Sequence, residues 1–160
     1  MINRLLWPKI IIAVVTCLLI GFLSSFATTE ALKDWYPSLV KPTFNPPSDI
    51  FAPVWTTLYI LMGIAVALVW QVGWDKLKVQ NAIMVFIAQL VLNGVWSMIF
   101  FGMQSIGGAL FIIVVLWVLI LVSIRRFFPL NKLAGILMIP YILWVSFALV
   151  LNASIYLLNK

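Results

Sequence analysis

Charged residues divide the chain into long uncharged stretches. Three of these stretches, residues 10–29, 50–74 and 133–159, each match one membrane-spanning helix, which needs roughly 20 apolar residues to cross the hydrocarbon core. A fourth, residues 79–124, is about twice as long as one span requires. It must therefore turn, and the segment Gly102 to Gly108 is the predicted turn. The pattern predicts five helices, at approximately residues 8–28, 50–73, 80–101, 107–125 and 133–157.

The apolar runs are continuous, whereas the strands of a membrane barrel alternate apolar and polar residues. We therefore expect an all-α, integral membrane bundle of five helices that forms a single domain over residues 1–160. Composition agrees, because 65% of the residues are hydrophobic, 9% are charged and the mean hydropathy is +1.19. One alternative stays open for the first helix. Arg4 and Lys9 before it and Ser25-Phe26-Ala27 near its end also fit a cleaved signal peptide.

The basic residues predict the orientation of this multi-pass protein in the membrane. Net charge is +6, but Lys and Arg lie at helix ends, which favours a topological role over nucleic-acid binding. One side carries seven of them and the other side three: Arg4, Lys9, Lys76, Lys78, Arg125, Arg126 and Lys132 against Lys33, Lys41 and Lys160. We expect the N-terminus in the cytoplasm, and the first loop and the C-terminus on the opposite side.

The first loop, residues 30–49, is polar, rich in proline and unusually long for a compact bundle. It also carries the aromatic residues Trp35, Tyr36 and Phe44. Prolines lower the conformational entropy that a loop loses when it becomes ordered. We therefore expect an ordered lid over one end of the bundle.

Several kinds of chemistry are excluded by composition. The chain has no His and only one Cys, Cys17, so a His-containing metal site, a Ser-His-Asp triad and an intramolecular disulfide are ruled out. Its four acidic residues lie outside the predicted spans, which argues against proton-driven transport. We expect no metal site and no bound cofactor.

Three predicted helices present aromatic and polar side chains on one face, and polar groups in hydrocarbon must point inward. Pro140 should kink the last helix one turn before Trp144. These faces fit either polar bridges between helices or an apolar pocket with a few polar groups, suited to a flat hydrophobic ligand. Their members are Trp55, Tyr59, Met62, Gly63, Val66 and Trp70; Gln89, Asn93, Trp96, Ser97 and Phe100; and Trp144, Ala148, Leu151, Asn152 and Ile155.

Spaced motifs along the whole chain resemble the translocator protein family, also called TspO, tryptophan-rich sensory protein or peripheral-type benzodiazepine receptor. One departure is Phe44, where the family often has Trp. The matching segments are Trp35-Tyr36, Leu39-Val40-Lys41-Pro42, Pro46-Pro47, Pro53-Val54-Trp55-Thr56-Thr57-Leu58-Tyr59, Met62-Gly63, Leu92-Asn93-Gly94-Val95-Trp96-Ser97, Phe100-Phe101, residues 140–148 and Leu151-Asn152.

The resemblance implies a five-helix bundle, commonly a homodimer, with a ligand cavity beneath the first loop. It also implies that helix one is retained. Implied ligands are porphyrins such as protoporphyrin IX, bound as ligand rather than as cofactor, and synthetic benzodiazepine-type or isoquinoline carboxamide compounds. The small-residue pattern Gly63-xxx-Ala67 is a common helix-packing motif that would also suit a dimer. The implied ligand-binding residues are Trp35, Tyr36, Trp55, Tyr59, Asn93, Trp96, Trp144, Phe147 and Ala148.

The function expected from pattern and resemblance together is that of a membrane receptor or sensor for tetrapyrroles. Two alternatives remain. One is light-dependent degradation of porphyrin, in which Trp55 and Trp144 would be the catalytic residues; the chain offers no acid-base pair for other chemistry. The other is transport of porphyrin or another hydrophobic metabolite across the membrane.

Overall fold

The computed structural model describes residues 6–160, and Arg4 of the predicted charge pattern lies outside them. Five spans are long and apolar enough to cross a membrane, and the described residues contain no strand, so the predicted five-helix membrane bundle is confirmed. The elements in chain order are α1 (Leu6–Ala31), α2 (Trp35–Ser38), α3 (Ser48–Gln71), α4 (Leu77–Ser97) continued by the π-helical turn η1 (Met98–Gly102), α5 (Ile106–Phe127), α6 (Lys132–Leu137) and α7 (Ile139–Leu158).

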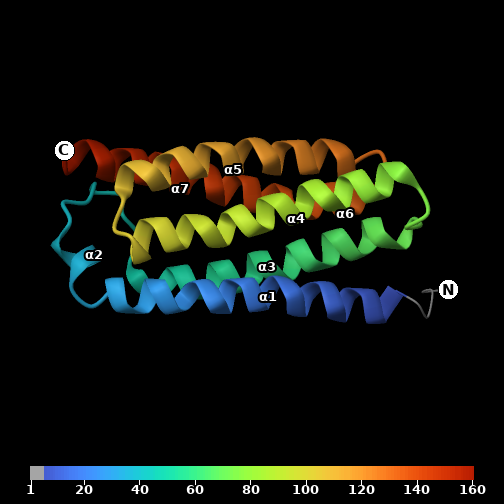
Figure 1. Cartoon of the computed structure of the whole chain (residues 1–160), viewed down its shortest axis with the longest axis horizontal. Coiled ribbons are helices and arrows are strands. Elements are labelled where there is room, and N and C mark those ends of the chain that lie inside the picture. The colour runs from blue at the N-terminus through green and yellow to red at the C-terminus, as the bar shows by residue number, and fades with distance from the viewer. Residues whose placement is uncertain (1–5) are drawn as a thin grey trace.

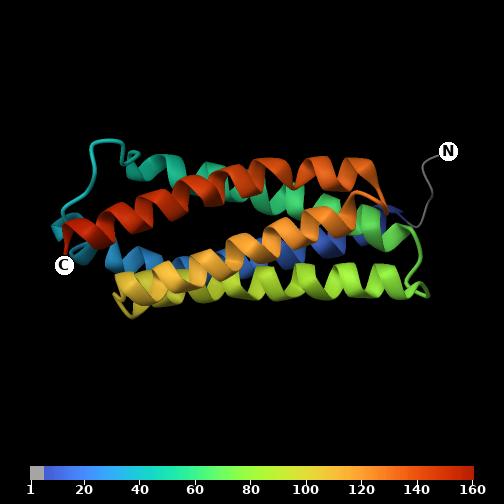
Figure 2. The same ribbon diagram turned by 90° about the horizontal axis from the view of Figure 1, so that it is seen from above.

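Successive long helices run antiparallel to one another, along the horizontal axis of Figure 1. One end of the bundle holds the start of α1 and the turns between α3 and α4 and between α5 and α6. The other end holds α2, the turn between η1 and α5, and the end of α7. Figure 2 shows the first loop arching from α2 to the start of α3 beside the C-terminus.

The spans extend slightly beyond the predicted boundaries. Glu30 belongs to the last turn of α1 and Asp49 to the first turn of α3, so the first loop is shorter than expected and contains the short helix α2. The reason is that charge marks where the hydrocarbon ends, whereas backbone hydrogen bonding lets a helix continue into the interface.

The predicted turn at Gly102 to Gly108 is also shorter than expected. Gly102 completes η1, while Gly107 and Gly108 lie in the first turn of α5. The reversal is made by residues 103–105, and it is Gln104, rather than a glycine, that adopts a positive φ of 53°. Glycine content therefore located the turn but not the residue that makes it.

The last span is broken at Met138, between α6 and α7, as Pro140 predicts. Because Pro140 has no N–H, it cannot continue the helical hydrogen bonding across the break. The helix axis changes direction at the break, because α3 packs extensively against α6 but only slightly against the much longer α7. Space consequently opens between α3 and α7 toward the first loop.

Helices α1 and α3 form the most extensive helix pair in the bundle. At Gly63, the position of an added Cβ would lie only 2.5 Å from the Cα of Val14, so the two backbones approach as closely as a glycine permits. Ala67, one turn further along, is fully buried. The Gly63-xxx-Ala67 pattern is therefore used within the protomer, and a homodimer would have to use another face.

We predict that a methyl group at Gly63 destabilises the bundle. Gly63→Ala should lower the free energy of unfolding by about 1–3 kcal/mol, because the new Cβ meets the α1 backbone, which cannot rotate away. SDS-induced unfolding of the purified protein in mixed micelles measures the change. Gly102→Ala is the matched control, since its Cβ would meet only the Cβ of Ala27 at 3.5 Å. Equal losses for the two variants would contradict the close α1–α3 packing.

Candidate functional site

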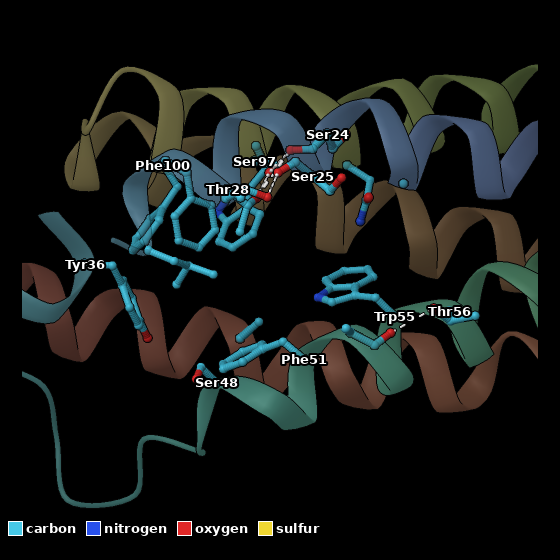
Figure 3. A pocket seen from close by; sticks show the side chains of 18 of the residues that line it. Ser24, Ser25, Thr28, Tyr36, Ser48, Phe51, Trp55, Thr56, Ser97 and Phe100 are labelled. Carbon is cyan, nitrogen blue, oxygen red and sulfur yellow. Dashed lines mark hydrogen bonds between the residues drawn. The ribbon is translucent and has the colours of Figure 1, made fainter. Parts of the chain in front are cut away.

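A cavity of about 570 Å³ lies inside the bundle near the end that carries the first loop. Its wall comes from α1, α3, α4, η1, α7 and the first loop, whereas α5 contributes no lining residue. Figure 3 shows side chains of α1 on one side of this space and those of α3 on the opposite side, with the indole of Trp55 projecting between them. The volume falls within the usual range for small-molecule pockets.

Seven of the nine predicted binding residues line the cavity: Tyr36, Trp55, Tyr59, Asn93, Trp96, Trp144 and Ala148. Trp35 and Phe147 do not. Trp35 packs edge-on against Phe100, at 5.5 Å between ring centroids, and so supports the wall from behind. Phe147 lies between Trp144 and Phe44, at 5.5 and 6.3 Å from their rings. The sequence placed these residues on the correct elements but could not show which aromatic side chains form the wall and which form its support.

A chain of hydrogen bonds crosses the centre of the bundle at the inner end of the cavity. Tyr59 Oη donates to Asn93 Oδ1 (2.5 Å), Asn93 Nδ2 donates to Tyr141 Oη (3.2 Å), and Tyr141 Oη donates to Gln89 Oε1 (2.8 Å). All four residues are buried. The chain joins α3, α4 and α7, and it occupies the amide oxygen of Asn93, which therefore acts first as a structural link.

A second set of polar contacts ties α4 to its other neighbours around the cavity. Trp96 Nε1 donates to Asn152 Oδ1 (3.1 Å), and Asn152 Nδ2 donates to the backbone carbonyl of Ile106 at the start of α5 (3.1 Å). The Oγ of Ser97 lies 3.0 Å from Thr28 Oγ1 on α1. These bonds account for the polar groups that the sequence placed on inward faces, so much of that pattern holds the helices together.

Helix α1 is the part of the wall that sequence reasoning missed. Its second half supplies small and hydroxyl-bearing residues to the cavity, where only the Trp-rich helices were expected to contribute. The signal was present, because hydroxyl side chains recur there at helical spacing. The residues are Leu18, Gly21, Phe22, Ser24, Ser25, Thr28 and Thr29, followed by Leu32 just after the helix.

Two of the tryptophans that line the cavity are Trp55 from α3 and Trp144 from α7. Trp55 stacks on Tyr59 at 5.6 Å between ring centroids, and Trp144 meets Phe51 edge-on at 6.0 Å. Within the described residues, Trp144 Nε1 and Gln89 Nε2 are the buried side-chain polar atoms without a hydrogen-bond partner. The remaining surface is mostly apolar, so ring contacts are the main interaction that this wall can offer.

The first loop is fixed over the end of the cavity. Tyr36 Oη donates to Asn45 Oδ1 (2.8 Å), and burial raises the pKa of the Tyr36 phenol above its usual value, against the lowering effect of that hydrogen bond. Lys41 Nζ donates to the carbonyls of Tyr36 and Leu39. Asn159 at the end of α7 makes a two-way amide contact with the backbone of Val40, at 3.0 and 2.9 Å. The ordered lid expected from the prolines is present.

No group of three or more His, Cys, Asp or Glu side chains that could hold a metal ion occurs within residues 6–160. The expectation that the protein carries no metal or cofactor stays a prediction. Among the described residues, the cavity lining also contains no acidic or basic side chain. The site can therefore supply aromatic contacts and a few neutral hydrogen-bonding groups.

Comparison with known proteins gives matches over nearly the whole chain. The TspO/MBR family model matches residues 13–158, which includes most of α1. The chain is 43% identical over 143 residues to the tryptophan-rich protein TspO of Chlorobaculum tepidum, covering 89% of this chain and 90% of that protein. It is 38% identical to the protein of the same name from Archaeoglobus fulgidus over 152 residues, 94% and 97% of the two chains. The human translocator protein is 41% identical over 88 residues, about half of each chain.

We predict that removing one hydroxyl from the central chain destabilises the bundle. Tyr141→Phe should lower the free energy of unfolding by about 1–2 kcal/mol, because it leaves the amides of Asn93 and Gln89 without their shared partner. Unfolding of the purified protein in mixed micelles is the measurement. Tyr156→Phe, at a partly exposed position on the same helix, should change stability by less than about 0.5 kcal/mol. The hydrogen-bond chain would contribute nothing if both variants behaved alike.

Proposed function

The chain belongs to the TspO/MBR family, and we propose that it is a membrane receptor or sensor that binds tetrapyrroles such as protoporphyrin IX and related flat hydrophobic ligands. The observation that carries this proposal is the cavity of about 570 Å³, with Trp55, Trp96 and Trp144 in its wall. Relatives named tryptophan-rich sensory protein and translocator protein support the family assignment.

The absence of charged side chains from the described cavity lining indicates how a porphyrin would be oriented. A buried carboxylate without a partner is costly, and no cation lines the cavity among the described residues. The propionate groups should therefore remain at the loop end, beside Tyr36 and Ser48, where Lys41 lies 5.0 Å from the Tyr36 ring. The apolar macrocycle would lie deeper, against the indoles of Trp55 and Trp144.

Light-dependent degradation of the bound porphyrin is the second candidate function. It is favoured by the placement of two oxidisable indoles, Trp55 of α3 and Trp144 of α7, in the wall of the same cavity. Trp55 is also close to two tyrosines, stacked on Tyr59 and edge-on to Tyr141 at 6.3 Å. In this hypothesis the two tryptophans are the catalytic residues.

The geometry favours binding over transport. A transport path needs a second opening, but the cavity ends at Tyr59 and Asn93. Beyond that point α1 and α3 approach each other at Gly63 as closely as a glycine permits.

We propose a membrane orientation with the N-terminus in the cytoplasm, based on seven Lys and Arg residues on that side against three on the other.

We expect metal-free protoporphyrin IX to quench the tryptophan fluorescence of the purified protein saturably. Ala148→Trp should weaken the affinity at least tenfold, because it places an indole inside the cavity. Val150→Trp on the same helix is the matched control, since Val150 is 55% exposed and does not line the cavity. Both variants add one tryptophan, so porphyrin absorbance measured in parallel corrects for the added fluorophore. The absence of saturable binding to the parent protein would contradict the proposed function.

The degradation hypothesis makes a separate prediction. A Trp55→Phe, Trp144→Phe double variant that still binds porphyrin should degrade it under illumination at least tenfold more slowly than the parent, measured as loss of porphyrin absorbance. Trp74→Phe, at an exposed position outside the cavity, is the control. If the double variant bleaches porphyrin as fast as the parent, the protein contributes binding alone.

A further inference from the structure

One side of the cavity is bordered by residues that are exposed on the outside of the bundle. Most of the inner lining is buried or half-buried, as at Tyr59 and Asn93, whereas Phe22, Ser25 and Thr29 of α1 are exposed and line the cavity as well. On α3, the exposed lining residues are Ser48, Ala52 and Thr56. The cavity is therefore reached from outside through the gap between α1 and α3.

The gap arises because the two helices diverge from a fixed point. A Cβ added to Gly21 would collide with the ring of Tyr59, so the helices are in direct contact there. Ser25 is one turn beyond Gly21 on α1, and Thr56 is about one turn before Tyr59 on α3. Both lie on the faces that continue this contact, yet both are exposed. Gly21 and Tyr59 thus mark the vertex of an opening that widens toward the first loop.

The inner part of the opening, at Ser25 and Thr56, lies at the depth of the hydrocarbon core. Ser25 is six residues before the end of α1, and Thr56 is eight residues after the start of α3, which correspond to about 9 and 12 Å along the helix axes. With 26 residues, α1 is about 39 Å long and exceeds a hydrocarbon core of about 30 Å by only a few ångströms at each end. Lipid chains, rather than water, adjoin this part of the opening.

The rim of the opening carries hydroxyl groups that already donate hydrogen bonds within the protein and need no water molecule as a partner. Ser25 Oγ donates to the Phe22 carbonyl (2.6 Å), Thr29 Oγ1 to the Ser25 carbonyl (2.8 Å) and Thr56 Oγ1 to the Ala52 carbonyl (2.8 Å). Each hydroxyl proton is satisfied within its own helix. The rim can therefore face hydrocarbon without the cost of an unpaired donor.

The other end of the cavity is fastened. Asn159, just after α7, holds the backbone of Val40 through two hydrogen bonds, whereas Lys41 Nζ binds the carbonyls of Tyr36 and Leu39 within the loop itself. Tyr36 packs on Phe101 at 5.7 Å and donates its hydroxyl to Asn45. Entry through the lid would require the two Asn159–Val40 hydrogen bonds and the Tyr36–Phe101 contact to break, because the other bonds are internal to the loop and stiffen it.

We infer that the ligand enters the cavity sideways from the bilayer, through a portal between α1 and α3 bounded by Ser25 and Thr29 on one side and Ala52 and Thr56 on the other. The inference rests on the proposed function and deepens it. It implies that the ligand class is hydrophobic compounds already dissolved in the membrane, and that partition into lipid precedes binding.

The test is the rate at which protoporphyrin IX, preloaded in phosphatidylcholine vesicles, quenches the tryptophan fluorescence of protein in fused proteoliposomes of the same lipid. Ala52→Trp should slow both association and dissociation at least tenfold, with a smaller change in Kd, because it narrows the passage in both directions. Thr29→Trp, on the opposite rim, serves if the first variant fails to fold. Ala88→Trp, at an exposed alanine of α4 that does not line the cavity, should alter the rates less than twofold.

Asn159→Ala provides the contrasting arm, because it unfastens the lid without touching the portal. The inference predicts an association rate within twofold of the parent, and a rate that falls as added lipid dilutes the porphyrin in the bilayer. Faster association in Asn159→Ala together with parent-like rates in both portal variants would overturn the lateral route while leaving binding intact. An absence of saturable quenching in the parent would instead overturn the proposed function, and the portal with it.

Discussion

The hydrogen-bonded chain from Tyr59 through Asn93 and Tyr141 to Gln89 is the interaction on which the rest of the bundle depends. In hydrocarbon, a polar group that lacks an internal partner is costly, so these four side chains must find one another. Their meeting fixes the relative rotation and height of α3, α4 and α7. The three tryptophans of the cavity wall, Trp55, Trp96 and Trp144, lie on the same helices and are positioned by the same constraint.

The cavity exists because two helix pairs that pack tightly at one end separate toward the other. α1 and α3 meet at Val14 and Gly63 and again at Gly21 and Tyr59, and beyond these points their facing side chains are exposed. The break at Met138 allows α6 to pack against α3 while α7 leaves it. Small residues and one proline thus create the space, and the tryptophans line it.

The number and type of elements followed directly from the sequence, because uncharged length in a membrane protein has few structural solutions. The inward faces of α3, α4 and α7 followed from helical periodicity together with the cost of polar groups in lipid. Other features depended on contacts that no local pattern specifies. The role of α1 as a cavity wall follows from how far α3 diverges from it. Similarly, Trp35 and Phe147 lie behind the wall because of the packing of Phe100 and Phe44. Gln104 makes the turn next to three glycines because the π-helical geometry of η1 delays the reversal past Gly102.

The contact between Asn159 and Val40 joins residues separated by 119 positions in the chain. During synthesis at the membrane, Val40 emerges long before Asn159, and the last four of the five spans lie between them in order of appearance. The roof of the cavity can therefore be latched only after the last helix has been made and inserted. Until then, the cavity wall lacks α7 and the first loop is not held at the end of the bundle. The contact between Asn159 and Val40 therefore forms late, and it forms only when the whole bundle has assembled.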